Sequence, residues 1–123
     1  MPSTKRDLIR IRHMLDAALK ALHFINGKNK IDYETDELLV LALVRLIEII
    51  GEAANKVTAE FKERFPNIPW NEIIGTRNHL IHGYEDVNLD ILWQIVSVDL
   101  VNLSQDLQKI VDQETNNEQL RLI

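Results

Sequence analysis

Residues 37–50 read ELLVLALVRLIEII, and this stretch decides the fold that the sequence predicts. Its apolar positions recur at spacings of three and four residues, which is the period of an α-helix. A helix with one buried face needs a single apolar stripe, but Leu38, Leu41 and Ile49 add apolar surface outside that stripe. We therefore expect this helix either to lie at the centre of a helical bundle or to carry a second apolar surface for self-association.

The segment before this stretch predicts another long helix. Residues 8–25 repeat apolar side chains every three or four positions, and Gly27 can end that helix by taking a left-handed conformation. The polar residues around Gly27 then form a loop, and either Asp32 or Asp36 can cap the start of the central helix. A hairpin of two antiparallel helices is the expected result.

Two more helices are expected after the central one. Residues 61–70 contain two prolines and read as an ordered connector, and a shorter helix then runs from Pro69 to about His82, where Gly83 can supply the C-terminal cap. Residues 88–110 keep the spacing of three and four through a last long helix. Because no segment shows the alternation of a strand, the sequence predicts an all-α, antiparallel four-helix bundle.

Length and composition predict the number of domains and the cellular compartment. A chain of 123 residues supports one core, which we assign to residues 1–112, and the polar residues 113–123 predict a flexible tail. There is no cysteine, so disulfides, thiolate chemistry and cysteine-bound zinc are excluded. The apolar run 38–44 is far shorter than the roughly 20 residues that span a bilayer. We expect a cytoplasmic protein that has no membrane partner.

The net charge of −5 weighs against a protein that coats nucleic acid, because that mode of binding needs a basic face with many phosphate contacts. A confined cluster can still hold one or two phosphates. Such a cluster lies at residues 77–84, which read RNHLIHGY and place an arginine, two histidines and a tyrosine within eight positions. This motif is the candidate functional site of the chain.

Arg77 and His82 are suited to cleaving RNA. RNA carries its own nucleophile, the 2′-hydroxyl, so cleavage needs a base, an acid and a cation that stabilises the extra charge on phosphorus. An imidazole can transfer protons near neutral pH, and a guanidinium can hold two phosphate oxygens. This scheme needs no metal and no other cofactor. Asn78 is a candidate for orienting the phosphate, and His79 for a second proton carrier.

The spacing of Arg77 and His82 sets a geometric condition. Five residues on a regular helix place two side chains about 140° apart. The pair can converge if the helix ends around His82, as Gly83 favours, or if two copies of the motif meet across a dimer interface. Tyr84 would then lie at the rim of the same site.

Structural interpretations compete with this one. Cations at a helix C-terminus are stabilised by the helix dipole, so the motif could serve stability alone. His79, His82 and Glu85 could bind a metal, although Gly83 interrupts the helix that would align them. On the central helix, Arg45, Glu48 and Glu52 could form the ordinary contacts between residues three and four positions apart. Alternatively, Glu52 could face the cleft and hold Arg77 or a histidine.

The segment 77–84 resembles the R-N-x-x-x-H-x-Y signature of the HEPN superfamily, and of the HepT-like toxins in particular. The similarity extends to other segments in the same order, and covers roughly residues 5–112. These segments are Ile49-Ile50-Gly51-Glu52-Ala53-Ala54, Phe65-Pro66-Asn67-Ile68-Pro69-Trp70 and Ile73-Ile74-Gly75. Gly75-Thr76 departs from the apolar residue that the family often has before the arginine.

The resemblance implies an all-helical, dimeric, metal-independent endoribonuclease toxin of a type II-like or type VII toxin–antitoxin module. Its partners would be RNA, a second copy of the chain and a minimal nucleotidyltransferase antitoxin, and no DNA partner is expected. By position, Arg77 and His82 would be the catalytic pair, and Tyr84 the tyrosine that the antitoxin adenylylates. The alternative is a non-catalytic helical module that serves as the accessory subunit of a nucleotidyltransferase, which the acidic charge and the surplus apolar surface of residues 37–50 also permit.

Overall fold

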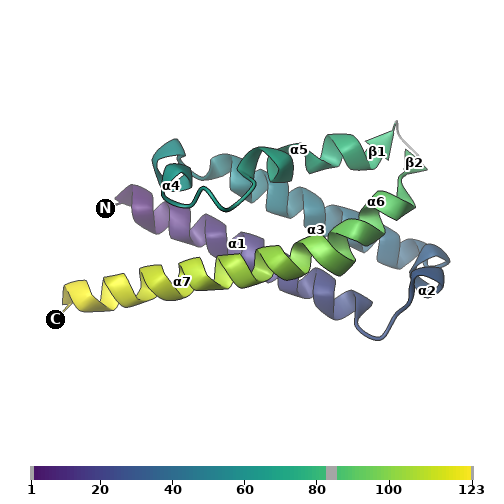
Figure 1. Cartoon of the computed structure of the whole chain (residues 1–123), viewed down its shortest axis with the longest axis horizontal. Coiled ribbons are helices and arrows are strands. Elements are labelled where there is room, and N and C mark those ends of the chain that lie inside the picture. The colour runs from purple at the N-terminus through teal and green to yellow at the C-terminus, as the bar shows by residue number, and fades with distance from the viewer. Residues whose placement is uncertain (1, 83–85, 123) are drawn as a thin grey trace.

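The computed structural model describes residues 2–82 and 86–122, with backbone only at positions 2–4, 77, 79, 81–82, 86 and 121–122. Its long elements are α1 (Pro2–Ile25), α3 (Glu37–Lys56), α5 (Trp70–Leu80) and a last helix made of α6 (Leu89–Gln94), η1 (Ile95–Asp99) and α7 (Leu100–Leu122). They run antiparallel in chain order (Figure 1). The predicted all-α bundle is confirmed.

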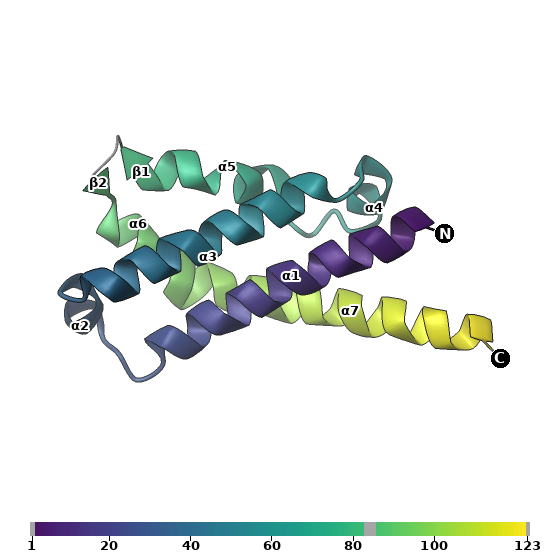
Figure 2. The same cartoon turned by 180° about the vertical axis from the view of Figure 1, so that it is seen from behind.

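Helix α3 lies at the centre of the bundle. It packs against α1 on one side and α5 on the other, and α1 also packs against α7 (Figures 1 and 2). Leu43 and Ile50 are among its buried residues, whereas Leu38 is 81% exposed and Leu41 is 55% exposed. The expected central position of α3 is therefore confirmed, and Leu38 and Leu41 add exposed apolar surface to it. The use of that surface for self-association stays a prediction.

Local signals place the helix ends. Asp36 caps α3, because its Oδ1 accepts a hydrogen bond from the Leu39 N–H at 3.1 Å, and Asn88 caps α6 in the same way from the Ile91 N–H. Gly27 has φ +77°, the left-handed conformation expected after α1. Asp32, the other candidate cap for α3, lies between α1 and α3. It forms a capping box with Asn29 at the start of a short helix.

Several short elements were not expected. Helix α2 (Lys30–Glu34) follows α1, and helix α4 (Ala59–Arg64) precedes the connector. Strands β1 (Ile81–His82) and β2 (Asp86–Val87) form an antiparallel pair. Elements of two to six residues contain too few positions for an apolar repeat to develop, so periodicity does not reveal them. The last helix also has a π segment, η1, in its middle.

The tail was expected to lack regular structure, but helix α7 continues through it to Leu122. Two contacts with other helices accompany this extension: Arg64 Nη2 lies 2.5 Å from the buried Glu114 Oε1, and Arg12 donates to Thr115 Oγ1 at 3.0 Å. Both partners in the tail are polar, which is why a search for apolar periodicity missed them. The domain boundary at residue 112 stays a prediction.

Among the described residues, no helix combines the length and the apolar character needed to cross a membrane.

Candidate functional site

The motif spans the end of α5 and the start of the strand pair. Arg77 and His79 lie on α5, together with the exposed Asn78. The helix ends at Leu80, slightly earlier than expected, and His82 then lies on β1. His82 is thus not on the helix that carries Arg77, and the 140° separation calculated for a continuous helix does not apply.

Strand β2 holds the chain that returns from the motif. Ile81 pairs with Val87 and His82 pairs with Asp86, and the Asn88 N–H donates to the Leu80 carbonyl oxygen at 2.9 Å. The backbone of His82 is therefore fixed by the segment that leads into α6. Tyr84, the candidate modification site, lies with Gly83 and Glu85 outside the described residues. The convergence of the Arg77 and His82 side chains stays a prediction.

A cavity of about 460 Å³ lies between α3 and α5, one helical turn before Arg77 along α5. Glu48, Gly51 and Glu52 line it from α3, and Ile73 and Ile74 line it from α5. The two backbones approach closely here, because a Cβ added at Gly51 would lie 3.3 Å from the Ile73 carbonyl oxygen. Because Gly51 has no side chain, α5, which carries the start of the motif, can lie this close to α3.

Glu52 lines this cavity and pairs with Arg45, whose Nη1 lies 3.2 Å from Glu52 Oε1 and 3.4 Å from Glu48 Oε2. The contact of Arg45 with Glu48 is the expected one between residues three positions apart, whereas its contact with Glu52 spans seven positions. Because Arg45 and Glu52 are both exposed, the pair contributes little stability. A supporting role of Glu52 toward Arg77 or a histidine stays a prediction.

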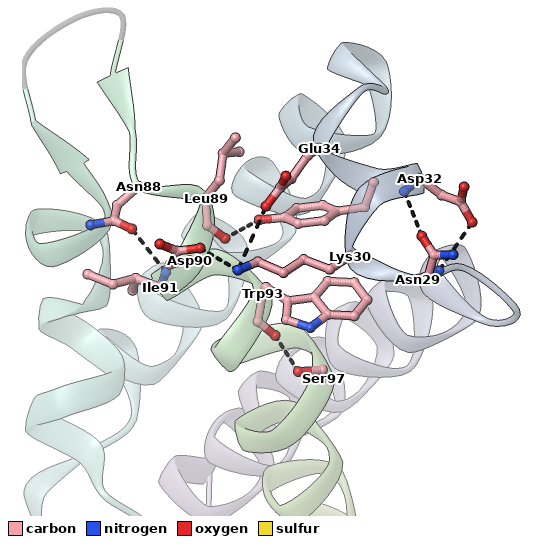
Figure 3. Close-up of polar contacts among 11 residues, drawn as sticks. Asn29, Lys30, Asp32, Glu34, Asn88, Leu89, Asp90, Ile91, Trp93 and Ser97 are labelled. Carbon is pink, nitrogen blue, oxygen red and sulfur yellow. Dashed lines mark hydrogen bonds and ion pairs between the residues drawn. The ribbon is translucent and has the colours of Figure 1, made fainter.

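A polar cluster joins α2 to the start of α6 (Figure 3). The Tyr33 hydroxyl donates a hydrogen bond to the Leu89 carbonyl oxygen, and the Tyr33 ring stacks on Trp93 with 4.9 Å between ring centroids. Beside them, Lys30 Nζ lies 2.6 Å from Asp90 Oδ1 and 3.8 Å from Glu34 Oε1. Sequence reasoning missed this cluster. The Asn29-x-x-Asp32 capping box could have indicated α2, but no sequence signal links Tyr33 to Leu89.

Burial and charge keep the hydroxyl of Tyr33 protonated. The tyrosine is fully buried, and this desolvation, followed by the nearby carboxylates of Glu34 and Asp90, raises its pKa to about 12. The hydrogen bond to Asp90 raises the pKa of Lys30 as well. At neutral pH the Tyr33 hydroxyl is therefore protonated and can donate to the Leu89 carbonyl oxygen.

Comparison with known proteins bears on the identity of this fold. The profile of the family described as "Ribonuclease HepT-like" matches residues 14–110, which include Arg77, His82 and most of the bundle. The chain belongs to the HepT-like ribonuclease family. The resemblance that the motif indicated is thereby confirmed.

Three relatives match this chain over most of their own length. "Putative RNase MJ1380" of Methanocaldococcus jannaschii is 32% identical over 106 residues, covering 85% of this chain and 97% of that protein. "Putative RNase TTE0752" of Caldanaerobacter subterraneus subsp. tengcongensis is 34% identical over 104 residues, covering 85% and 93%. "Probable ribonuclease HepT" of Thermococcus cleftensis is 37% identical over 79 residues, covering 64% and 72%. No solved structure matches the chain.

A metal centre was the competing interpretation of the HepT-like motif. In the part of the chain that the structure describes, no group of three histidine or carboxylate side chains could hold a metal ion. The set considered from the sequence comprises His79, His82 and Glu85. Because Glu85 lies outside the described residues, that particular set is not tested.

Proposed function

We propose that this chain is an endoribonuclease that cleaves RNA by internal attack of the 2′-hydroxyl, with Arg77 and His82 as the catalytic pair. The observation that carries the proposal is the end of α5 at Leu80, which separates His82 from the helix of Arg77 in a chain of the HepT-like ribonuclease family. This break removes the geometric objection to the pair. The names of the relatives give independent support for RNA as the substrate.

The proposed reaction is a transfer of the phosphoryl group within the RNA strand. His82 accepts the proton of the 2′-hydroxyl, whose oxygen attacks phosphorus as the bond to the 5′-oxygen breaks. The 5′-oxygen leaves with a proton from an acid, for which His79 is the candidate. Arg77 binds the non-bridging oxygens and stabilises their added negative charge. The products are a 2′,3′-cyclic phosphate and a 5′-hydroxyl.

The test is cleavage of a broad panel of RNAs by the purified protein in the presence of EDTA. We expect cuts that leave cyclic phosphate ends, because neither an added metal nor an outside nucleophile takes part in the reaction. The same strands with 2′-deoxy sugars should remain intact. Cleavage that disappears with EDTA, or that leaves 3′-hydroxyl ends, would refute the mechanism.

We propose that adenylylation of Tyr84 controls this activity and that a minimal nucleotidyltransferase antitoxin catalyses it. An AMP group two residues from His82 would place bulk and negative charge beside the groups that bind the RNA phosphate. Coexpression with such an enzyme should add the mass of one or more AMP units and suppress cleavage. Tyr84→Phe is the control, since a mass shift that persists in this variant would place the modification elsewhere.

We also propose that the chain forms a homodimer through the start of α3. Leu38 and Leu41 are exposed there. Leu41 also lines a cavity of about 310 Å³ together with Val87, which lies in β2, and Leu89, which begins α6. A partner on this surface would lie next to the motif. Light scattering at micromolar concentration should give twice the mass of one chain. Leu38→Lys should lower this measured mass toward that of one chain.

The control for this interface is Leu19→Lys. Leu19 is 47% exposed on α1, so the substitution adds the same charge to an exposed leucine on a different helix. It should leave the mass unchanged. A wild-type protein that is monomeric at micromolar concentration would contradict the dimer.

A further inference from the structure

The cluster around Tyr33 ties two parts of the chain that lie far apart in the sequence. Helix α2 has five residues, and an isolated helix of that length is unstable in water. Its stability must therefore come from tertiary contacts. The contacts it makes through Lys30 and Tyr33 reach the segment 89–93, which begins α6 (Figure 3).

The segment that α2 holds is the one that positions His82. Leu89, which accepts the hydrogen bond from Tyr33, follows Asn88 directly, and the Asn88 N–H donates to the carbonyl oxygen of Leu80. Val87 and Asp86 then pair with Ile81 and His82. Only a few residues and one strand pair separate the Tyr33 hydroxyl from the His82 backbone.

We propose that Tyr33 is a positioning residue: its hydrogen bond to Leu89 holds the junction of β2 and α6, and thereby fixes the backbone of His82 relative to α5. Its effect on cleavage rests on the proposed function, whereas its effect on the strand pair does not. Nothing in the motif itself assigns this role, because Tyr33 lies in a helix that precedes the central helix of the bundle.

The chemistry of Tyr33 distinguishes positioning from simple filling of the core. A phenylalanine would fill the same buried volume and stack on Trp93 equally well, but it could not donate to the Leu89 carbonyl oxygen. The Lys30–Asp90 pair is a weaker candidate for the same role. Lys30 is 46% exposed and Asp90 is 80% exposed, and ion pairs between exposed groups contribute little.

The test combines hydrogen exchange with RNA cleavage in Tyr33→Phe. The amide of Asn88 should exchange about five-fold faster than in the wild type, as expected for the loss of one hydrogen bond. The slowest amides of α3 should change less than two-fold, which shows that the bundle as a whole is intact. The rate constant at saturating RNA should fall about ten-fold, because a small displacement of His82 disturbs the reacting geometry.

Affinity for RNA separates positioning from binding. Measured in a His82→Ala background, where cleavage should be too slow to interfere, the dissociation constant for RNA should change less than two-fold on adding Tyr33→Phe. A loss confined to the rate constant is the signature of misplaced catalytic geometry. A purely structural role would instead lower the fraction of folded protein and speed exchange throughout α3.

Ser104→Ala and Lys30→Met are the matched controls. Ser104 is buried in α7 and donates to the Val101 carbonyl oxygen at 2.8 Å, so Ser104→Ala removes a buried hydroxyl and a hydrogen bond that lies within one helix. It should alter neither the exchange of the Asn88 amide nor cleavage. Lys30→Met should change both quantities less than two-fold, and a larger effect than that of Tyr33→Phe would overturn the assignment to Tyr33.

The outcomes decide the two proposals separately. If the Asn88 amide exchanges at the wild-type rate in Tyr33→Phe, Tyr33 does not hold the junction and the inference fails. Faster exchange with an unchanged rate of cleavage would also overturn it as a positioning role. A wild-type protein that cleaves no RNA contradicts the proposed function instead, and the exchange of Asn88 then decides whether Tyr33 fixes the strand pair.

Discussion

Arg77→Ala and His82→Ala should each lower the rate constant for RNA cleavage at saturating RNA by at least about a hundred-fold. Proton transfer by a positioned side chain contributes on the order of 10² to 10⁴, and loss of a group that stabilises transition-state charge costs on the order of 10² to 10³. Arg77→Lys should retain part of the activity, since it keeps the charge and loses the two-pronged contact with phosphate. Gel assays on a cleavable RNA measure all three variants.

His13→Ala and Arg6→Ala are the controls for these substitutions. Both residues are exposed on α1, so each variant removes the same type of side chain from a surface outside the motif. They should cleave RNA at the wild-type rate, and circular dichroism should show all variants equally helical. The catalytic assignment is wrong if folded Arg77→Ala and His82→Ala proteins cleave as fast as the controls.

Arg64→Ala should lower the free energy of unfolding by about 2 kcal/mol, a large share of a small domain's stability. Arg64 contacts the Glu114 carboxylate, which is only 4% exposed, and its guanidinium lies 5.3 Å from the Phe61 ring centroid and 5.2 Å from that of Phe65. Removing the cation leaves a buried negative charge without this partner. Because Arg64 is itself 43% exposed, water can reach the site, and we expect less than the full penalty of a buried pair.

Urea unfolding at one fixed protein concentration measures this effect, since dimerisation would make stability depend on concentration. In the double variant Arg64→Ala with Glu114→Gln, part of the loss should be recovered, because the carboxylate no longer carries a charge. Arg45→Ala breaks an exposed ion pair on α3 and should change stability by less than about 1 kcal/mol. An Arg64→Ala protein as stable as Arg45→Ala would contradict the account.

The long elements could be predicted because each combines a repeat with an end signal. Helix α3 shows the apolar period and Asp36 caps its start, and Gly27 follows the end of α1. The segment 113–122 was misjudged because polar groups tie it to the bundle across long stretches of sequence. From the sequence alone, Glu114 is expected on the surface, and only the folded structure shows that Arg64 lies beside it.

For the candidate site too, sequence reasoning predicted one part and missed another. The residue types of the motif, and the need for the helix to end, are visible in the sequence because they depend on neighbours within a few positions. The early end at Leu80 and the pairing of β1 with β2 depend on a return strand, which no local pattern indicates. The role of Tyr33 is even harder to predict from the sequence. Its hydrogen-bond acceptor is the backbone carbonyl of Leu89, and every residue type has such a carbonyl.

The first and last helices of the described chain both reach the end of the bundle that carries α4, and the β1–β2 pair lies at the opposite end (Figures 1 and 2). An affinity handle, a dye or a sensor surface joined at the start of α1 or at the end of α7 would therefore have the length of the bundle between it and the motif. Immobilised in this orientation, the protein would present the motif outward, so the proposed binding of RNA could be followed in real time without the attachment covering the motif.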